Sequence, residues 1–317
     1  MKLIDMHCDT FYRMKECSTR QNILKNQFHV DLEKLKHTRS YIQCFALYSD
    51  LKACEDKGLD PWTYILELYA LIKDEIATTN GLIEVARSME NVDNIQAKGH
   101  LAAMLTVEDG GIIYEDMNRL NTLYKMGVRM MSLTWDYSNS LGHPNLPETS
   151  HLGLTAFGHQ VIERMNSLGM IIDVSHLSDK GFWEILESST SPVVASHSNA
   201  RAVLNHRRNL DDEMIRALGN KGGVMGLNFC PFFVADKGDK LFVEDLVKHV
   251  QHVINKGGED CAAIGTDFDG MNGSLEIKHI GEMDKLYYGL NSAGLSFDLI
   301  DKVFYKNSKR VFTDVIG

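Results

Sequence analysis

The chain has 317 residues, with 33 Lys and Arg against 43 Asp and Glu, which gives a formal net charge of −10 at pH 7 with His neutral. This acidic balance argues against a nucleic-acid partner, because phosphate backbones call for clustered Lys and Arg. Apolar residues make up 44% of the chain and charged residues 24%, a balance typical of globular proteins and not of disordered ones.

The six cysteines form no Cys-x-x-Cys pair, so the sequence indicates neither a disulfide framework nor a thiolate zinc site, and the thiols suit a reducing compartment. Asp5 and Asp9 interrupt the short apolar run at the start, unlike a signal peptide. No segment approaches the ~20 apolar residues that span a membrane, and the last residues lack the tail of a lipid-anchor signal. We therefore expect a cytoplasmic protein without a membrane partner.

Short apolar or β-branched runs alternate with longer segments of helical spacing along the chain. Strands are expected over residues 2–6, 41–48, 101–107, 128–134, 170–174, 193–196, 224–229 and 262–266. Helices are expected over residues 61–79, 116–126, 155–168, 180–188, 211–219 and 243–256. This alternation predicts a parallel sheet.

Eight such units, in a chain slightly longer than the ~250 residues typical of the fold, predict a closed (β/α)₈ barrel of the TIM type. The barrel would form one domain over residues 1–317. An open, doubly wound sheet would give a similar alternation, although no Gly-x-Gly-x-x-Gly follows the first strand. A barrel builds its active site from residues at the C-terminal ends of its strands, so polar residues should gather there.

Residues of metal-binding types do stand at these strand ends. They are His7 and Asp9 after the first strand, Glu108 after the third, His176 after the fifth, His197 after the sixth and Asp267 after the eighth. His, Asp and Glu are common ligands of zinc and of other divalent ions. The pattern therefore predicts a metal site at one end of the barrel.

The residue pattern alone leaves alternatives at two of these strand ends. Asp109 is as available as Glu108, which we prefer because it is in phase with Thr106. Asp173 is a rival of His176 as a ligand, or it orients a ligand histidine from behind.

Asp267 is the carboxylate at the end of the last predicted strand, whereas Asp269-Gly270 is typical of a turn. Asp267 is therefore placed to take a proton from a metal-bound water. Together the strand-end residues predict a two-metal hydrolase site, in which the ions activate a shared water and polarise a substrate carbonyl. Such a site needs no Ser or Cys nucleophile.

In its motifs the chain resembles the membrane dipeptidases, also called renal dipeptidase-like zinc peptidases, and in particular their soluble bacterial members. The resemblance covers nearly the whole chain. It rests on His7-Cys8-Asp9, Val107-Glu108, residues 172–179 and 196–200, Arg207-Arg208-Asn209-Leu210, and residues 266–270. It implies a dinuclear zinc dipeptidase that hydrolyses free dipeptides, including those with a C-terminal D-residue, by a hydroxide that bridges the metals.

The resemblance also implies a role for each strand-end residue. One Zn²⁺ ion would be held by His7, Asp9 and Glu108, and the other by Glu108, His176 and His197, so that Glu108 bridges the two ions.

Two further residues take roles from the resemblance. Asp267 would handle the proton of the water, and Arg208 would bind the carboxylate of the substrate's C-terminal residue. The second role agrees with chemistry, because a guanidinium offers a planar fork to a carboxylate. Relatives are commonly homodimers, so a homodimer is compatible with the resemblance, although the sequence reveals no interface.

One position departs from the family pattern. In the better-known animal members a His follows the fourth strand and contacts the reacting carbonyl oxygen, whereas Trp135 occupies that place here. An indole offers one N–H donor but cannot act as an acid. We expect Trp135 to contact the substrate, and His143 and His151 in the following loop are candidates for the missing contact.

Two other functions remain open from the sequence. One is a different metal-dependent amidohydrolase on the same barrel, acting on N-acyl amino acids, cyclic amides or lactones, because the fold alone does not separate these chemistries. The other is a non-catalytic small-molecule binding protein, which the departure at Trp135 motivates.

Overall fold

The computed structural model describes residues 1–317, and its centre is a parallel sheet that curls onto itself. The strand order is β1 (Leu3–Asp5), β2 (Ser40–Tyr48), β4 (Leu101–Glu108), β5 (Val128–Ser132), β6 (Ile171–Asp173), β7 (Val194–Ser198), β8 (Val224–Leu227) and β10 (Ala262–Ile264). The sheet closes between its ends, where the Met6 N–H donates to the Ile264 carbonyl at 3.0 Å. The predicted barrel is confirmed, and the open doubly wound alternative is wrong.

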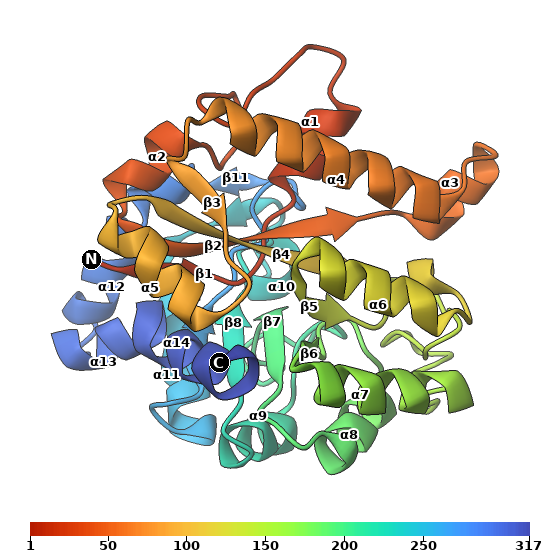
Figure 1. Ribbon diagram of the computed structural model, residues 1–317. Coiled ribbons are helices and arrows are strands. Elements are labelled where there is room, and N and C mark those ends of the chain that lie inside the picture. Colours follow the sequence, from red (N-terminus) through yellow and green to blue (C-terminus); the bar gives the residue numbers. More distant parts are fainter.

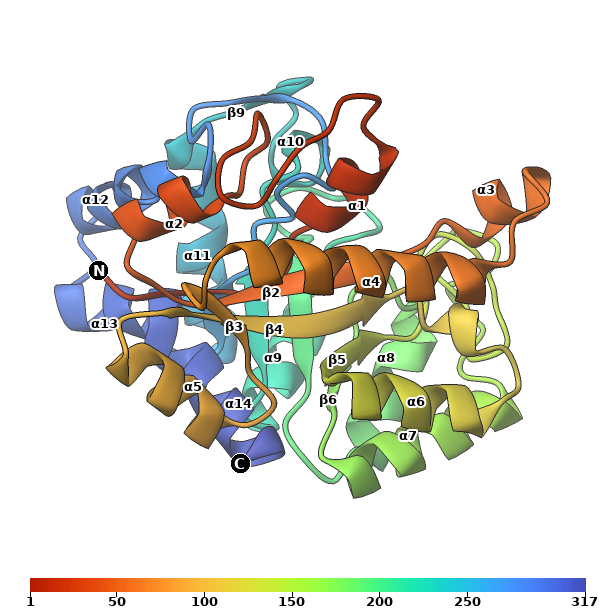
Figure 2. The ribbon, with the colours of Figure 1, turned by 45° about the horizontal axis from the view of Figure 1, so that its top comes forward.

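Helices cover the outside of this barrel, and α4 runs beside β2 in both ribbon views (Figures 1 and 2). The six predicted helices are present as α4 (Pro61–Thr78), α6 (Met117–Met126), α7 (Ala156–Leu168), α8 (Asp179–Ser188), α9 (Asp212–Asn220) and α11 (Val243–Gly257). Most begin at a side chain that accepts a hydrogen bond from a free backbone N–H of the first turn. Asp116 caps α6, Thr155 caps α7 and Asp211 caps α9 in this way.

The structure also has elements that were not predicted, and most of them are too short for an apolar period to show. The strands among them are β3 (Ile83–Val85), which pairs with β4, and the pair β9 (Lys240–Leu241) and β11 (Ser274–Leu275). The α-helices are α1 (Thr10–Glu16), α2 (Leu32–His37), α3 (Leu51–Asp56), α5 (Met89–Ala97), α10 (Pro231–Val234), α12 (Asp284–Ser292), α13 (Phe297–Asp301) and α14 (Asn307–Ile316). η1 (Gly110–Ile113) and η2 (Ile280–Glu282) are 3-10 turns, and η3 (Lys302–Lys306) is a short π-helix. None of the helices is both long and apolar enough to cross a bilayer.

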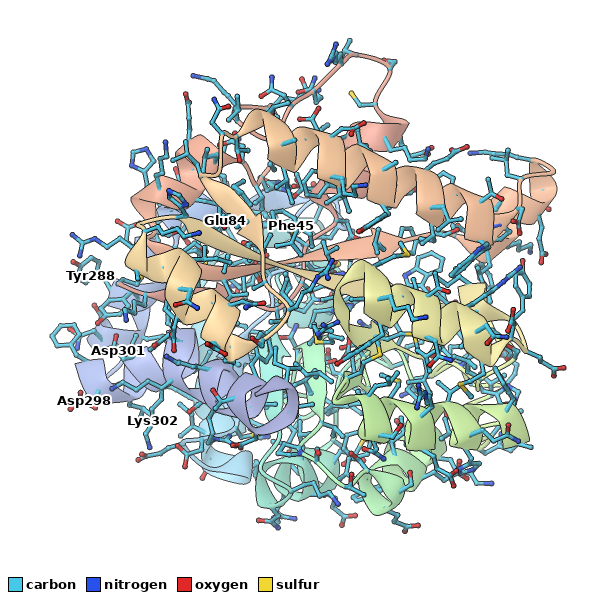
Figure 3. The ribbon with its side chains drawn as sticks, in the orientation of Figure 1. Phe45, Glu84, Tyr288, Asp298, Asp301 and Lys302 are labelled. Carbon is cyan, nitrogen blue, oxygen red and sulfur yellow. The ribbon has the colours of Figure 1, made fainter.

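Two apolar clusters hold the barrel together. The smaller contains a residue from every strand of the barrel, which places it inside: Ile4, Ile42, Met104, Met130, Ile171, Val194, Val224 and Ala263. The larger lies between strands and helices and includes Phe45 of β2, which is fully buried, whereas Tyr288 of α12 points outward (Figure 3). Apolar side chains thus fill the barrel interior, and polar side chains collect at the carboxyl ends of its strands.

Candidate metal centre

Glu108 lies at the middle of the cluster that forms at the C-terminal end of the barrel. Its Oε2 atom is 3.2 Å from His7 Nε2. Its Oε1 atom is 2.8 Å from His176 Nε2 and 3.4 Å from His197 Nε2. All four side chains are buried. The two oxygens of one carboxylate therefore face histidines from different strands.

Two aspartates complete the cluster on the side of His7. Asp9 Oδ2 is 3.2 Å from His7 Nε2, and Asp267 Oδ1 is 3.9 Å from the same nitrogen. His7 and Asp9 do project to one side, while Cys8 is buried in the outer apolar cluster. The structure thus brings together the five predicted metal ligands and Asp267.

The chain takes up unusual backbone angles to place two of these side chains. His176 has a φ of 67° and Asp267 a φ of 61°, in the left-handed region that non-glycine residues rarely adopt. Such a residue costs about 1–3 kcal/mol and persists where the surrounding structure enforces it. The strain lies at the strand ends that carry the candidate site.

A relay of hydrogen bonds fixes the ring of His197. The Ser196 hydroxyl donates to Asp173 Oδ2 at 2.6 Å, so its oxygen is left to accept from His197 Nδ1 at 2.7 Å. The Nδ1 atom therefore carries the proton, and the Nε2 lone pair faces Glu108. Asp173 acts through Ser196, which agrees with its suggested role behind a ligand histidine.

His176 has a different outer partner, which sequence reasoning missed. Its Nδ1 atom lies 3.4 Å from Asp136 Oδ1, and the other oxygen of Asp136 accepts from Arg207 Nη2 at 3.1 Å. Burial would raise the pKa of Asp136, but His176 and Arg207 together lower it below its usual range. Asp136 directly follows Trp135 in a loop, where no periodic pattern marks it.

Asp267 is held by a residue that the sequence also did not mark. Asn228 Nδ2 donates to Asp267 Oδ2 at 3.0 Å, which leaves Oδ1 directed toward His7. Gly270 packs against the same carboxylate, because a Cβ atom there would overlap Asp267 Oδ1 and Asp9 Oδ2. The Asp-Gly turn after Asp267 thus has a packing reason.

Two other carboxylates at these strand ends bind loop residues. Asp109 accepts from the Gly111 N–H at 2.7 Å and from Asn139 Nδ2 at 2.6 Å. Asp269 accepts from Thr10 Oγ1 at 2.6 Å and from the His29 N–H at 2.7 Å. Asp109 Oδ1 and both oxygens of Asp269 therefore hold loop residues, whereas Glu108 and Asp267 lie beside His7 in the cluster.

A pocket of about 420 Å³ opens above the cluster, a size suited to a small ligand. Arg208 lines it, is only 4% exposed and donates from Nη2 to the His197 carbonyl at 3.2 Å. Its Nε atom is buried without a hydrogen-bond partner. An unpaired guanidinium N–H at a buried wall of the pocket is a ready donor for an anionic group.

Trp135 also lines the pocket and forms part of an aromatic wall. Its ring packs edge-on against Tyr48, with 5.3 Å between the ring centroids. Neither His143 nor His151 lines the pocket, and His143 Nδ1 instead pairs with Ser138 Oγ at 2.8 Å. The suggestion that one of these histidines reaches the reacting group finds no support.

The cluster concentrates charge in a buried space. Burial would lower the pKa of His7, but Glu108 and Asp9 raise it well above its ordinary value. Burial raises the pKa of Asp9 to about 7 against the opposing effect of His7. Burial and the neighbouring His7 lower the pKa of His197 to about 4. A positive charge placed among Asp9, Glu108 and Asp267 would therefore be stabilised.

A bound cation fits these residues. The Oδ1 atom of Asp9 is buried without a partner, and the Nε2 atoms of His176 and His197 face each other at 3.0 Å. The ligand atoms of His7, Glu108 and His197 lie within 4.8 Å of one another, as do those of His7, Asp9 and Asp267. Imidazole and carboxylate groups without thiolates suit zinc and similar divalent ions.

A closed parallel barrel with histidines and carboxylates gathered at its C-terminal end is the architecture of metal-dependent hydrolases. The family model of the membrane dipeptidases (peptidase family M19) matches residues 1–316. The chain belongs to this family and is a metallo-dipeptidase, which confirms the resemblance read from its motifs.

Individual relatives agree with this assignment. The chain is 33% identical over 265 residues to an uncharacterized protein of the pqqA 5′ region of Klebsiella pneumoniae, covering 81% of this chain and 97% of that protein. It is 27% identical over 294 residues to the dipeptidase tcpJ of Claviceps purpurea, covering 90% of this chain and 69% of that protein.

A solved structure shares the fold. It is a metallopeptidase from Rhodobacter sphaeroides, liganded with a phosphinate mimic of the dipeptide L-Ala-D-Ala, with a TM-score of 0.90 and 24% identity over 99% of both chains. At this identity the likeness shows the fold alone.

Proposed function

We propose that this metallo-dipeptidase uses two zinc ions and hydrolyses free dipeptides, including those with a C-terminal D-residue. The observation that carries the proposal is the position of Glu108, whose two carboxylate oxygens face His7 on one side and His176 and His197 on the other. A carboxylate so placed is suited to bridge two ions.

The proposed ligands divide into two sets that share Glu108. His7 and Asp9 would hold one ion with Glu108, and His176 and His197 would hold the other with Glu108. When bound, the ions lower the pKa of a water molecule and polarise the scissile carbonyl.

Asp267 is the proposed acid and base of the reaction. Asn228 occupies its Oδ2 atom, so Oδ1 is the oxygen that faces the reaction space. In the proposed reaction, Oδ1 accepts a proton from the attacking water and then delivers it to the leaving amine. One carboxylate can serve both steps because the proton stays at the same oxygen between them.

Arg208 is the proposed anchor for the substrate's C-terminal carboxylate. Its Nε atom has no protein partner, and its position beside the His197 carbonyl is fixed. A carboxylate held there would lie one residue from the scissile bond, which leaves no space for a longer product and restricts the substrate to dipeptides. Trp135 would pack against the substrate from the aromatic wall.

Inclusion of D-residues is supported by the ligand of the Rhodobacter sphaeroides metallopeptidase, a mimic of L-Ala-D-Ala. The test is to incubate zinc-reconstituted protein with L,L and L,D dipeptides, an N-acetylated dipeptide and a tripeptide, and to follow amino-acid release. We expect chelator-sensitive cleavage of both free dipeptides alone, with two zinc ions per chain by elemental analysis.

Asp267→Asn provides the matched control, because it should keep both zinc ions and lose at least about 100-fold in kcat, the lower end of what proton transfer contributes. Cleavage of the tripeptide would refute the restriction to dipeptides. Cleavage of the N-acetylated dipeptide alone would favour an amidohydrolase of different specificity. One zinc ion per active chain would refute the dinuclear site.

A further inference from the structure

Asp136 connects two parts of the candidate site. Its Oδ1 atom lies 3.4 Å from His176 Nδ1, and its Oδ2 atom accepts from Arg207 Nη2 at 3.1 Å. His176 is a proposed zinc ligand, and Arg207 precedes the proposed carboxylate anchor Arg208. Asp136 reaches this position from the loop between β5 and α7, and it also lines the pocket.

We propose that Asp136 is a positioning residue that holds His176 in the orientation and tautomer required to bind a metal ion, an inference that rests on the proposed function. A carboxylate beside Nδ1 keeps the proton on that nitrogen and leaves the Nε2 lone pair free. Nε2 is the atom that faces Glu108 Oε1, at 2.8 Å.

Asp136 is the one hydrogen-bond partner of the His176 Nδ1 atom. The neighbouring ligand His197 is held separately, through Ser196 and Asp173. The backbone of His176 is tied by its carbonyl, which accepts from the Asn145 N–H at 2.9 Å. This tie fixes the main chain but leaves the imidazole ring to be set by Asp136.

Arg207 forms an ion pair with Asp136 but makes no hydrogen bond to His176. Its guanidinium pairs with Asp136 and donates from Nη1 to the Asn145 carbonyl at 3.1 Å. The side chains of Asp136 and Arg207 are each 32% exposed, and ion pairs exposed to this degree contribute little to stability. Loss of Arg207 should therefore leave the contact between Asp136 and His176 in place.

The test is equilibrium zinc binding to the full-length protein, measured by competition with a chromophoric chelator. The variants are Asp136→Ala, Asp136→Asn and Arg207→Gln, each compared with the unmodified chain. We expect Asp136→Ala to weaken binding of the second zinc ion, the one proposed at His176 and His197, about 10- to 100-fold. This is the usual effect of removing the outer partner of a metal-binding histidine. Binding of the first ion, held by His7 and Asp9, should not change.

The other two variants separate positioning from folding. Asp136→Asn keeps an oxygen acceptor for His176 Nδ1, so zinc affinity should recover to within about fivefold of the unmodified chain. Arg207→Gln should stay within about threefold, because it leaves Asp136 in place. Binding of Co²⁺ gives a second readout, since its visible absorption should change in Asp136→Ala and be restored in Asp136→Asn.

The outcomes distinguish this inference from the proposed function. If the unmodified chain binds fewer than two ions, the proposed function fails and the inference fails with it. If it binds two ions and Asp136→Ala binds both as tightly, the inference alone is overturned. An equal loss of affinity in Asp136→Ala and Arg207→Gln also overturns it, because the ion pair would then act by supporting the loop.

Discussion

Arg208 is the side chain whose proposed role depends most on its own chemistry. It is buried, its Nη2 atom is used by the His197 carbonyl, and its Nε atom is free. Arg208→Lys keeps the positive charge but loses the planar fork. We expect KM for dipeptides to rise about 10- to 100-fold with a smaller effect on kcat, because hydrogen bonds to charged groups are worth about 1.5–3 kcal/mol. Steady-state kinetics on one L,D dipeptide checks this.

Arg207→Lys is the matched control for that change. Arg207 precedes Arg208 but pairs with Asp136, so a lysine there keeps the charge opposite Asp136. Its KM should remain within about threefold of the unmodified chain, as expected for a partly exposed ion pair. A raised KM in Arg207→Lys together with an unchanged KM in Arg208→Lys would contradict the proposal and would indicate Arg207 as the residue that binds the substrate carboxylate.

Single residues could be predicted from the sequence where a strand end marked them. His7, Glu108, His197 and Asp267 each follow a short apolar run, and the structure places them together. The residues that orient them could not be found in this way. Asp136 and Asn228 act through contacts between segments far apart in the chain, and no local pattern records such a contact.

The strands of the barrel depend on two glycines where neighbouring backbones come close. A Cβ atom at Gly226 in β8, or at Gly265 directly after β10, would overlap the carbonyl oxygen of Ser196 in β7. Gly265→Ala should therefore lower the free energy of unfolding by about 2–3 kcal/mol, since a rigid backbone atom cannot give way. Zinc binding should weaken as well, because Ser196 holds His197. Chemical denaturation and zinc titration measure the two effects.

Gly142→Ala is the matched control for Gly265→Ala. The nearest atom to a Cβ there is Leu154 Cδ2 at 3.3 Å, the end of a flexible side chain. Gly142→Ala should lower the free energy of unfolding by less than about 1 kcal/mol, because the Leu154 side chain can move. If Gly265→Ala and Gly142→Ala lowered the free energy of unfolding equally, the close contact between Gly265 and the Ser196 carbonyl oxygen would not explain the effect of Gly265→Ala.

The elements that the sequence predicted are those with a strong local pattern. All eight barrel strands and the six predicted helices lie within a few residues of their expected bounds. α1 was missed because it begins directly after Asp9, where the strand motif dominates. β3 is three residues long and gains its place by pairing with β4, which is a tertiary contact and not a local preference. The left-handed backbone of His176 and Asp267 likewise comes from the assembled barrel.

The whole molecule should become more stable with zinc, and the gain should grow with pH. Without metal, His7 holds its proton because its pKa is raised well above the ordinary value, and burial raises the pKa of Asp9 to about 7. An unfolded aspartate has a pKa of about 3.9, so between about pH 4 and pH 7 the folded, metal-free protein binds a proton that the unfolded chain does not. The stability that Asp9 contributes to the metal-free protein therefore falls as pH rises through this window, and loss of the His7 proton acts in the same direction at higher pH. His197, whose pKa is lowered to about 4, contributes in the opposite direction.

Zinc affinity rises with pH, because the ion requires ionised Asp9 and neutral His7 and must displace their protons. Free zinc at 100 times its dissociation constant adds about 2.7 kcal/mol for each bound ion, or about 4 °C in Tm per ion for a chain of this length at pH 7.5. The gain over a chelated sample should shrink steadily toward about pH 5.5, where the competing protons are bound. Thermal unfolding at several pH values checks this, and Asp9→Asn should lose about half of the zinc-dependent gain, because the ion at His176 and His197 does not use Asp9. An equal gain at every pH would mean that zinc stabilises the protein at groups other than this cluster.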